Sequence, residues 1–228
     1  MNIAIIPARG GSKRIPRKNI KLFAGMPMIS YAISAAKRTG LFSRIIVSSD
    51  DEEIIKIAKM YGAEAPFIRP HNLSDDMTST VPVINHAIDF CLSTSGDIEN
   101  VCCIYPCVPL ISSKDIQKSL DLMLENKSNS CFPVSEFISA PQRALTRDNN
   151  GRMQSLYPEF RKMRTQDLQS TFFDVGQFYW GKISAWQDNA ISEGIGFIVP
   201  KWRVIDIDNL EDWKMAEFYY ELLHNKGV

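Results

Sequence analysis

The sequence predicts an α/β fold in which a mostly parallel β-sheet is covered by helices on both faces. Strand-like and helix-like segments alternate four times in the first 135 residues. Short, continuous apolar runs such as Ile3–Ile6 and Asn100–Pro106 are typical of strands that are buried on both faces. This alternation requires crossover helices, which place the strands parallel in a Rossmann-like layer. With 228 residues and 45% apolar side chains, we expect a single domain over residues 1–228.

Turn and cap residues mark most of the remaining elements. Pro27 suits the first position of a helix over residues 28–39, which Gly40 ends. Asp50 or Asp51 suits the N-cap of the next helix. We expect further strands or extended segments at 44–50, 65–70, 129–137, 172–180, 195–199 and 203–208, and further helices at 51–62, 81–92, 115–126 and 209–223.

The alternation lapses between about residues 135 and 180. Residues 135–169 are rich in Pro, Arg, Asn and Gln, and the DNNG sequence at 148–151 favours a turn. We expect a small excursion out of the sheet here, inserted in the single domain. Such a segment can serve as a substrate lid or as a dimerisation contact.

The strand predicted at Ile3–Ile6 runs into a loop that contains Gly10, Gly11 and Ser12. The loop also carries five basic side chains: Arg9, Lys13, Arg14, Arg17 and Lys18. Glycine lets the backbone present N–H groups to an anion, and Arg and Lys add charge-assisted bonds to phosphate oxygens. The combination indicates a nucleotide triphosphate site. The alternative is a plain turn with solvated charges, and the loop matches neither G-x-G-x-x-G nor G-x-x-x-x-G-K-[ST].

The distribution of charge favours the phosphate site. The chain is formally neutral, with 26 basic and 26 acidic residues. Residues 1–49 contain nine Lys or Arg and no Asp or Glu, which leaves 17 basic against 26 acidic residues in the remainder. This polarity indicates one surface for an anionic ligand and separate carboxylates that could hold a metal. A nucleic-acid-binding role is not expected, because such proteins are basic overall.

The cysteines and the N-terminus favour a cytoplasmic protein. A strand is predicted within two residues of Met1, so we expect no signal peptide, and no apolar run approaches the ~20 residues that span a bilayer. Five cysteines, an odd number, favour reduced thiols. Cys102, Cys103 and Cys107 cluster, but we expect small core residues there rather than metal ligands.

A second pattern of interest is the V-I-D-I-D sequence at Val204–Asp208. In a strand, Asp206 and Asp208 would project from one face while Ile205 and Ile207 project from the other. Two adjacent carboxylates repel each other unless a cation lies between them, and Mg²⁺ takes two carboxylates together with phosphate oxygens and waters. The alternative is that Asp208 caps the closing helix and Asp206 pairs with an arginine.

Three motifs together resemble one family over nearly the whole chain. They are IIPARGGSKRIPRKNI at 5–20, RPHNLSDDMTST at 69–80 and IDIDNLEDW at 205–213. The sequence is similar to the CMP-sugar-acid synthetases, also called acylneuraminate cytidylyltransferases. The resemblance implies a nucleotide-diphospho-sugar transferase type of fold, CTP as co-substrate, Mg²⁺ as cofactor and a homodimer.

Three shorter segments resemble one branch of that family. PQRAL at 141–145, YPEF at 157–160 and FDVGQFYWG at 173–181 look most like the branch that uses pseudaminic acid. The implied product is a CMP-sugar for cell-surface glycans, such as those of flagellin glycosylation.

The resemblance also implies roles for individual residues. The residues that match the loop holding the CTP triphosphate are Arg9, Gly10, Gly11, Ser12, Lys13 and Lys18. Asn19 and Arg69 match positions near the cytosine and ribose, and Thr80 lies close to them. Asp206 and Asp208 match the metal-binding pair. We therefore expect Arg9, Lys18, Asp206 and Asp208 to carry catalysis.

One departure from the family bears on the sugar. Where sialic acid enzymes usually read Q-P-T-S-P-L, this chain reads Y-P-C-V-P-L at 105–110, so Tyr105 replaces a glutamine that would touch the sugar acid. This disfavours N-acetylneuraminate. A sugar acid also needs cations or N–H donors for its carboxylate and acceptors for its hydroxyls and amides. The candidate sugar-binding residues are Tyr105, Gln142, Arg143, Arg164, Gln166, Asp174 and Gln177.

The implied reaction is attack of the anomeric 2-hydroxyl of the sugar acid on the α-phosphate of CTP, which releases pyrophosphate. Alternative substrates are N-acetylneuraminate, legionaminate and keto-deoxy-octulosonate. A different class of function is a non-catalytic nucleotide-binding protein of the same fold. One subunit's excursion could complete the sugar site of its partner.

Overall fold

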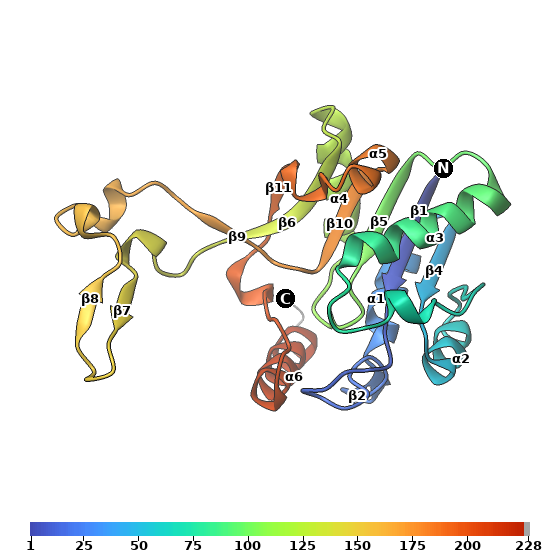
Figure 1. The fold of residues 1–228 in the computed structure, drawn as a ribbon, viewed down its shortest axis with the longest axis horizontal. Coiled ribbons are helices and arrows are strands. Elements are labelled where there is room, and N and C mark those ends of the chain that lie inside the picture. The colour runs from blue at the N-terminus through green and yellow to red at the C-terminus, as the bar shows by residue number, and fades with distance from the viewer. Residues whose placement is uncertain (226–228) are drawn as a thin grey trace.

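The structure is a computed structural model that describes residues 1–225. Its centre is a seven-stranded sheet with the order β11-β6-β10-β5-β1-β4, to which β9 is added by pairing with β6 (Figure 1). The strands of this sheet are β1 (Asn2–Pro7), β4 (Arg44–Ser48), β5 (Asn100–Ile104), β6 (Ser130–Glu136), β9 (Phe172–Asp174), β10 (Phe178–Lys182) and β11 (Ile195–Ile198).

The sheet is mostly parallel, as predicted. β1 pairs in parallel with both β4 and β5, and β6 pairs in parallel with β11. β10 lies between β5 and β6 and is antiparallel to both. β9 is also antiparallel to β6. The strand-like segment predicted at 172–180 is therefore two strands, each antiparallel to β6, separated by irregular backbone at residues 175–177.

Helices cover both faces of the sheet, which confirms the layered α/β prediction. Alternate residues of β1 enter two separate cores: Ala4 and Ile6 enter one, and Ile3 and Ile5 enter the other. The first core includes residues of α1 (Ile29–Thr39), α2 (Glu52–Met60) and α4 (Ser113–Glu125). The second core includes residues of α3 (Thr80–Ser95) and α5 (Ile183–Gln187). No helix among residues 1–225 is long and apolar enough to cross a membrane.

A third core joins the N-terminal loop to the C-terminal helix α6 (Leu210–Asn225). Trp213 of α6 packs edge-on against Phe23 with their ring centroids 5.4 Å apart. Phe23 belongs to a short hairpin made of β2 (Leu22–Phe23) and β3 (Met26–Pro27). The prediction that Pro27 begins the first helix is wrong, because Pro27 closes this hairpin and α1 begins at Ile29.

Local capping signals locate helix ends correctly. The Asp51 carboxylate accepts from the backbone N–H groups of Glu53 and Ile54, so Asp51 is the N-cap of α2. Gly40 has φ of +65° at the C-terminus of α1, a conformation that glycine adopts without steric cost.

Two extended segments are not strands of the sheet. Residues 65–70 form no strand. Just before them, Glu64 makes an isolated bridge with Ile46 of β4, the strand at one edge of the sheet. Val204–Asp208 is irregular and follows the 3₁₀ turn Lys201–Arg203. The strand prediction failed there because the Ile207 side chain is buried in the third core, and its carbonyl bonds to Lys18 rather than to a strand.

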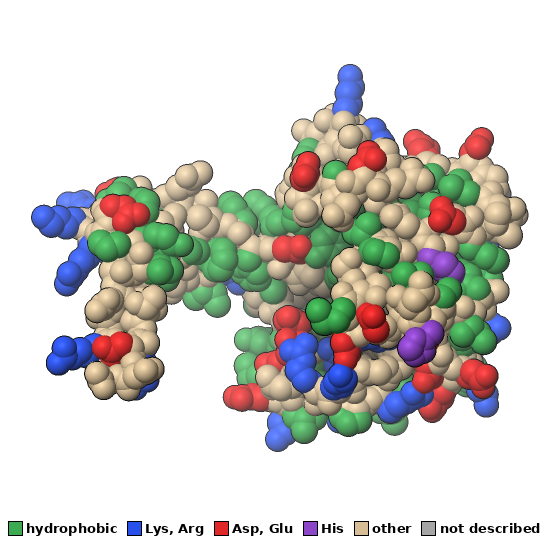
Figure 2. Space-filling view, in the orientation of Figure 1, with side chains coloured by type: hydrophobic (Ala, Val, Ile, Leu, Met, Phe, Trp, Pro, Cys, Tyr) green, Lys and Arg blue, Asp and Glu red, His purple; other side chains and the backbone are tan. Residues whose placement is uncertain are grey.

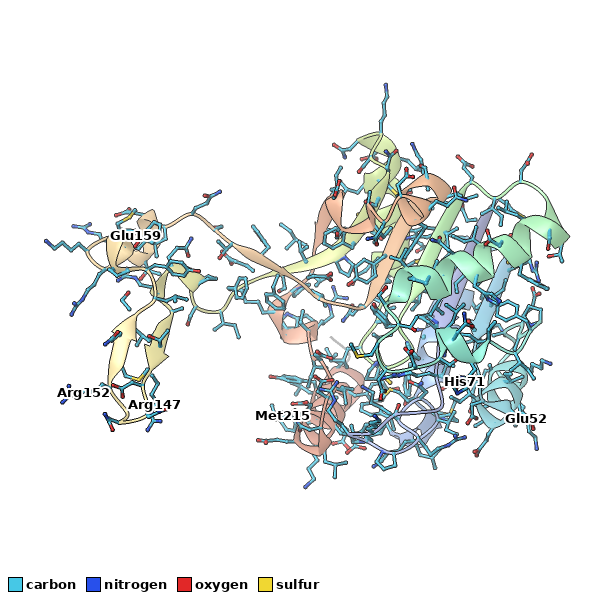
Figure 3. All side chains as sticks on the ribbon, in the orientation of Figure 1. Glu52, His71, Arg147, Arg152, Glu159 and Met215 are labelled. Atoms are coloured by element: carbon cyan, nitrogen blue, oxygen red, sulfur yellow. The ribbon has the colours of Figure 1, made fainter. Side chains whose placement is uncertain are left out.

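Residues 137–171 form an arm that extends away from the body (Figure 1). The arm contains a hairpin of β7 (Leu145–Arg147) and β8 (Met153–Ser155), and its turn at 148–151 includes Gly151 at φ +84°. Figure 3 labels Arg147, Arg152 and Glu159 on it, far from the body. Within residues 1–225, the 3₁₀ turns are His71–Leu73, Pro141–Arg143, Pro158–Phe160, Thr165–Asp167, Ile191–Glu193 and Lys201–Arg203.

Candidate active site

A cleft of about 620 Å³ opens beyond the carboxyl ends of β1 and β5. Ligands of open α/β sheets bind at this edge, because loops that follow adjacent parallel strands converge there. Eight predicted site residues line the cleft: Arg9, Ser12, Lys13, Lys18, Asn19, Tyr105, Asp174 and Asp206. Basic and acidic side chains lie next to one another on the lower part of the body, apart from the arm (Figure 2). The basic loop and the late aspartate therefore share one site.

Arg9 and Lys13 face an acidic segment that follows the 3₁₀ turn His71–Leu73. Arg9 Nη1 lies 2.7 Å from Asp76 Oδ1, and Lys13 Nζ pairs with the other Asp76 oxygen. Arg9 Nη1 also donates to the Asp75 backbone carbonyl at 2.9 Å. Two residues predicted to bind phosphate thus have a carboxylate as partner. The sequence indicated no such pairing, because the partners are more than 60 residues apart.

The glycine turn contacts Asp50 and Asp51, the two residues that precede α2. The Gly10 N–H donates to Asp50 Oδ1 at 3.0 Å, so this amide, expected on a phosphate, has a protein partner. A Cβ at Gly10 would lie 2.7 Å from Asp51 Oδ2, whereas one at Gly11 would meet nothing within 4 Å. Arg17 has φ of +58° and holds Asp51 with two guanidinium nitrogens. The Arg17 hydrogen bond, together with backbone N–H groups of α2, lowers the pKa of the Asp51 carboxyl.

Lys18 and Asn19 connect the loop to two other parts of the site. Lys18 Nζ donates to the Ile207 carbonyl at 2.7 Å, which ties the loop to the segment of Asp206. Asn19 Nδ2 donates to the Arg9 carbonyl at 2.8 Å, and its Oδ1 accepts from Cys107 Sγ at 3.2 Å. Cys107 lines the cleft, and burial raises the pKa of its thiol to about 12. The prediction of a small core residue missed this contact.

A smaller pocket of about 230 Å³ adjoins the cleft and shares Arg9 and Tyr105 with it. Arg69 and Thr80 line this pocket, and Thr80 Oγ1 lies 2.8 Å from the Tyr105 hydroxyl. Arg69 is 5% exposed, and its buried Nε has no hydrogen-bond partner among the described residues. Burial lowers the pKa of Arg69, and Asp50 at 3.5 Å partly compensates. Arg69 therefore places a largely buried guanidinium in the lining of this pocket.

The two predicted metal ligands differ in their surroundings. Asp206 lines the cleft, whereas Asp208 Oδ2 pairs with Arg14 Nη1 at 2.5 Å. Arg14 also lines the cleft. The alternative that Asp208 caps α6 and Asp206 pairs with an arginine is wrong. Asn209 caps α6, because its Oδ1 accepts from the backbone N–H groups of Glu211 and Asp212. The aspartate that pairs with an arginine is Asp208. Among the described residues, no three His, Cys, Asp or Glu side chains are placed to hold a metal.

Two tyrosines and Asp174 form the far wall of the cleft. Tyr179 donates its hydroxyl to Asp174 Oδ2 at 2.6 Å, and the Gly176 N–H donates to Asp174 Oδ1 at 2.8 Å. The rings of Tyr105 and Tyr179 meet edge to face, with their centroids 5.8 Å apart. Burial raises the pKa of Tyr105 to about 12. Tyr179 lies beside Asp174 because irregular backbone at residues 175–177 interrupts the strand-like segment, which the sequence pattern does not reveal.

The other predicted sugar-binding residues do not reach this cleft. Gln177 is 6% exposed and does not line the cleft; its Nε2 donates to the Arg203 carbonyl at 3.1 Å. Gln142 and Arg143 hold the arm together through bonds to carbonyls of residues 161, 163 and 169. Arg164 and Gln166 are exposed on the arm. None of the described residues that line the cleft belongs to 137–171.

A mostly parallel α/β sheet with a basic glycine turn and carboxylates in one cleft defines the class of nucleotidyltransferases. A cytidylyltransferase family profile matches residues 3–165, and the chain belongs to this family. It is 40% identical to the pseudaminic acid cytidylyltransferase of Campylobacter jejuni over 99% of both chains. It is 27% identical to the post-translational flagellin modification protein B of Campylobacter coli, over 95% of this chain and 93% of that one.

A solved structure shows the same fold. CMP:2-keto-3-deoxy-manno-octonic acid synthetase, determined in complex with CTP, superposes with a TM-score of 0.70 at 16% sequence identity. The match covers 100% of this chain and 99% of that one. The α/β architecture is therefore that of the CMP-sugar synthetases.

Proposed function

We propose that the protein transfers the cytidylyl group of CTP to a nonulosonic acid, and specifically to pseudaminic acid. The observation that carries this proposal is the single cleft in which Arg9, Lys13 and Lys18 face Asp206. The 40% identity to a pseudaminic acid cytidylyltransferase over the whole chain supports the substrate. The protein then works in the cytoplasm, where CTP is made, and supplies a CMP-sugar for surface glycans such as those on flagellin.

The reaction joins two anions, so its main requirement is neutralisation of charge. The 2-hydroxyl oxygen of the sugar acid bonds to the α-phosphorus of CTP, the hydroxyl proton is lost, and the bond from the α-phosphorus to the α–β bridging oxygen breaks. Pyrophosphate leaves. Arg9 and Lys13 hold the departing phosphates, while Ser12 and the Gly10–Gly11 backbone shape the turn around them. Such transfers depend on positioning and electrostatic stabilisation.

The smaller pocket suits the nucleoside. Arg69 and Thr80 line this pocket, where the Arg69 guanidinium could donate to a carbonyl oxygen of cytosine, and Asn19 lines the adjoining cleft on the side where the ribose would lie. A ligand acceptor here would satisfy a donor that otherwise incurs a desolvation penalty. This pocket joins the cleft at Arg9, so the triphosphate passes from one to the other.

Asp206 and Asp208 would hold Mg²⁺. Two carboxylates and the phosphate oxygens of CTP would form the oxygen-rich donor set that Mg²⁺ prefers. When bound, the metal acts as a Lewis acid on a phosphoryl oxygen. Arg14 is the partner that Asp208 would exchange for it.

The wall of Tyr105, Tyr179 and Asp174 suits the sugar acid. Asp174 is oriented by Tyr179 and Gly176, so its remaining lone pairs can accept from an amide or a hydroxyl of the sugar. The arm presents exposed apolar side chains, including Ile138 at 87% and Leu145 at 58% exposure. These suit a second copy of the chain, and a homodimer would allow Arg164 and Gln166 of one arm to reach the sugar site of the other subunit.

The test is mass spectrometry of the products after incubation with CTP, Mg²⁺ and a panel of sugar acids. Pseudaminic acid should give its CMP conjugate and pyrophosphate faster than legionaminate, N-acetylneuraminate or keto-deoxy-octulosonate. Turnover of another acid in preference would contradict the substrate. CTP binding without turnover of any acid would contradict the enzymatic role and favour a nucleotide-binding protein.

A further inference from the structure

Asp76 occupies the position that an anionic ligand of Arg9 and Lys13 would take. One carboxylate oxygen lies 2.7 Å from Arg9 Nη1, and the other pairs with Lys13 Nζ. Arg9 is also bound by the Asp75 backbone carbonyl at 2.9 Å. Lys13 is 80% exposed, so these pairs lie at an open lip of the cleft that a dissolved anion can reach. A phosphate that binds Arg9 Nη1 and Lys13 Nζ at these positions displaces this carboxylate.

The segment that presents Asp76 is ordered by its own hydrogen bonds. Asp75 Oδ1 accepts from the N–H groups of Met77 and Thr78 at 3.0 and 2.7 Å, and from Thr78 Oγ1 at 2.6 Å. Ser74 Oγ also donates to the Pro70 carbonyl, just before the preceding 3₁₀ turn, at 3.0 Å. These bonds order the backbone on both sides of Asp76, so release of the two cations does not require the turn to unfold.

We propose that Asp76 is an internal competitor for the pyrophosphate part of the nucleotide, and so a specificity-determining residue of the reaction. This inference rests on the proposed function. Residues 1–49 have no acidic residue of their own, so Asp76 supplies the carboxylate that pairs with two cations of the loop. An anion with a single negative charge does not displace the Asp76 carboxylate, because it offers Arg9 and Lys13 no more charge than the carboxylate does. A triphosphate brings several charges and does displace it.

The same contact acts after the transfer. When the α–β bond breaks, pyrophosphate remains on Arg9 and Lys13, and Asp76 competes for both cations from a few ångströms away. Return of Asp76 therefore favours release of the product. Cytidine and CMP lack the β and γ phosphates, so their binding does not depend on Asp76.

The test uses the full-length protein with Asp76→Asn, which keeps the side-chain shape of the turn and removes the charge. Isothermal titration with pyrophosphate, CTP and CMP should show pyrophosphate and CTP binding about 3- to 10-fold tighter, as expected from loss of two weak surface ion pairs. CMP affinity should not change. The affinity for pyrophosphate should also fall more steeply with salt than in the wild type, because free cations then exchange solution ions.

Two further variants act as controls. Glu52→Gln removes one exposed carboxylate from α2 (labelled in Figure 3), and it should leave all three affinities unchanged. Asp76→Glu keeps the charge and should behave like the wild type. Equal or weaker pyrophosphate binding by Asp76→Asn, in a wild type that binds and turns over CTP, would overturn this inference alone. Failure of the wild type to bind CTP would instead overturn the proposed function.

Discussion

Lys18 Nζ donates to the Ile207 backbone carbonyl at 2.7 Å, joining the glycine turn to the segment of Asp206 and Asp208 across 189 positions of sequence. Ile207 itself is buried, so the segment is held by its side chain on one side and by Lys18 on the other. The backbone between the two aspartates is therefore fixed without a strand. Lys18 was predicted to bind phosphate, and its position makes it a positioning residue for the aspartates as well.

Replacing Lys18 should affect catalysis more than nucleotide binding. In Lys18→Ala we expect kcat to fall by about 10- to 100-fold, because the aspartate segment loses a charge-assisted tether. Lys18→Arg should recover part of the loss. Steady-state kinetics with CTP and the sugar acid measure this, and a raised KM for CTP with unchanged kcat would show that Lys18 contributes to binding alone.

The two glycines of the phosphate loop should differ in their tolerance of a side chain. Gly10→Ala places a Cβ 2.7 Å from Asp51 Oδ2, and must displace the carboxylate that binds Arg17. Gly11→Ala meets nothing within 4 Å. We expect Gly10→Ala to destabilise the protein by about 1–3 kcal/mol, the usual range for overpacking, and to weaken CTP binding. Thermal denaturation and CTP titration of both variants check this, and equal behaviour of the pair would refute it.

Asp51 should contribute stability that depends on pH. Its pKa is lowered, first by the Arg17 hydrogen bond and then by backbone N–H groups, so its contribution is complete above an unfolded pKa of about 4 and is lost as the pH falls below it. Asp51→Ala should cost about 0.5–2 kcal/mol as a lost N-cap. Asp51→Asn keeps the cap but not the charge.

Denaturant unfolding of the wild type and of Asp51→Asn between about pH 5 and pH 3 measures the contribution of the charge. The wild type should lose more free energy of unfolding over this interval than Asp51→Asn does. Identical pH profiles would mean that the Arg17 pair contributes nothing to stability.

The cysteines should react slowly in the native protein. All five are free, and burial raises the pKa of Cys107 to about 12 and that of Cys131 to about 11. Only the thiolate reacts quickly, so iodoacetamide at about pH 8 should label the folded chain far more slowly than the chain in guanidinium. Mass spectrometry locates the label. Rapid native labelling of Cys107 would contradict its bond to Asn19.

Local signals in the sequence predicted the parts of the fold that depend on neighbouring residues. The Asp51 cap, the Gly40 helix end and the buried β1 run are such cases. The antiparallel position of β10 could not be predicted in this way, since strand order depends on contacts between distant segments. The V-I-D-I-D alternation also suggested a strand, but it arises because Ile207 packs against the third core.

The sequence predicted which types of residue form the candidate site, but it did not predict all of their contacts. The acid-free loop indicated a phosphate site, and eight of the predicted residues line the cleft. The partners of those residues come from other segments: Asp76, the partner of Arg9, lies in the 69–80 motif, but nothing in that motif shows which basic residue it faces. Gln142 and Arg143 have the N–H donors expected of sugar-binding residues, but in the structure these donors bond to backbone carbonyls within the arm.

The most direct test of the shared cleft is the turnover of Asp206→Ala, measured as pyrophosphate release with CTP, Mg²⁺ and pseudaminic acid. We predict a loss of about 100-fold or more, with an unchanged circular dichroism spectrum, while Asp89→Asn, an exposed carboxylate on α3, keeps wild-type turnover. Near-normal turnover by Asp206→Ala would contradict the account.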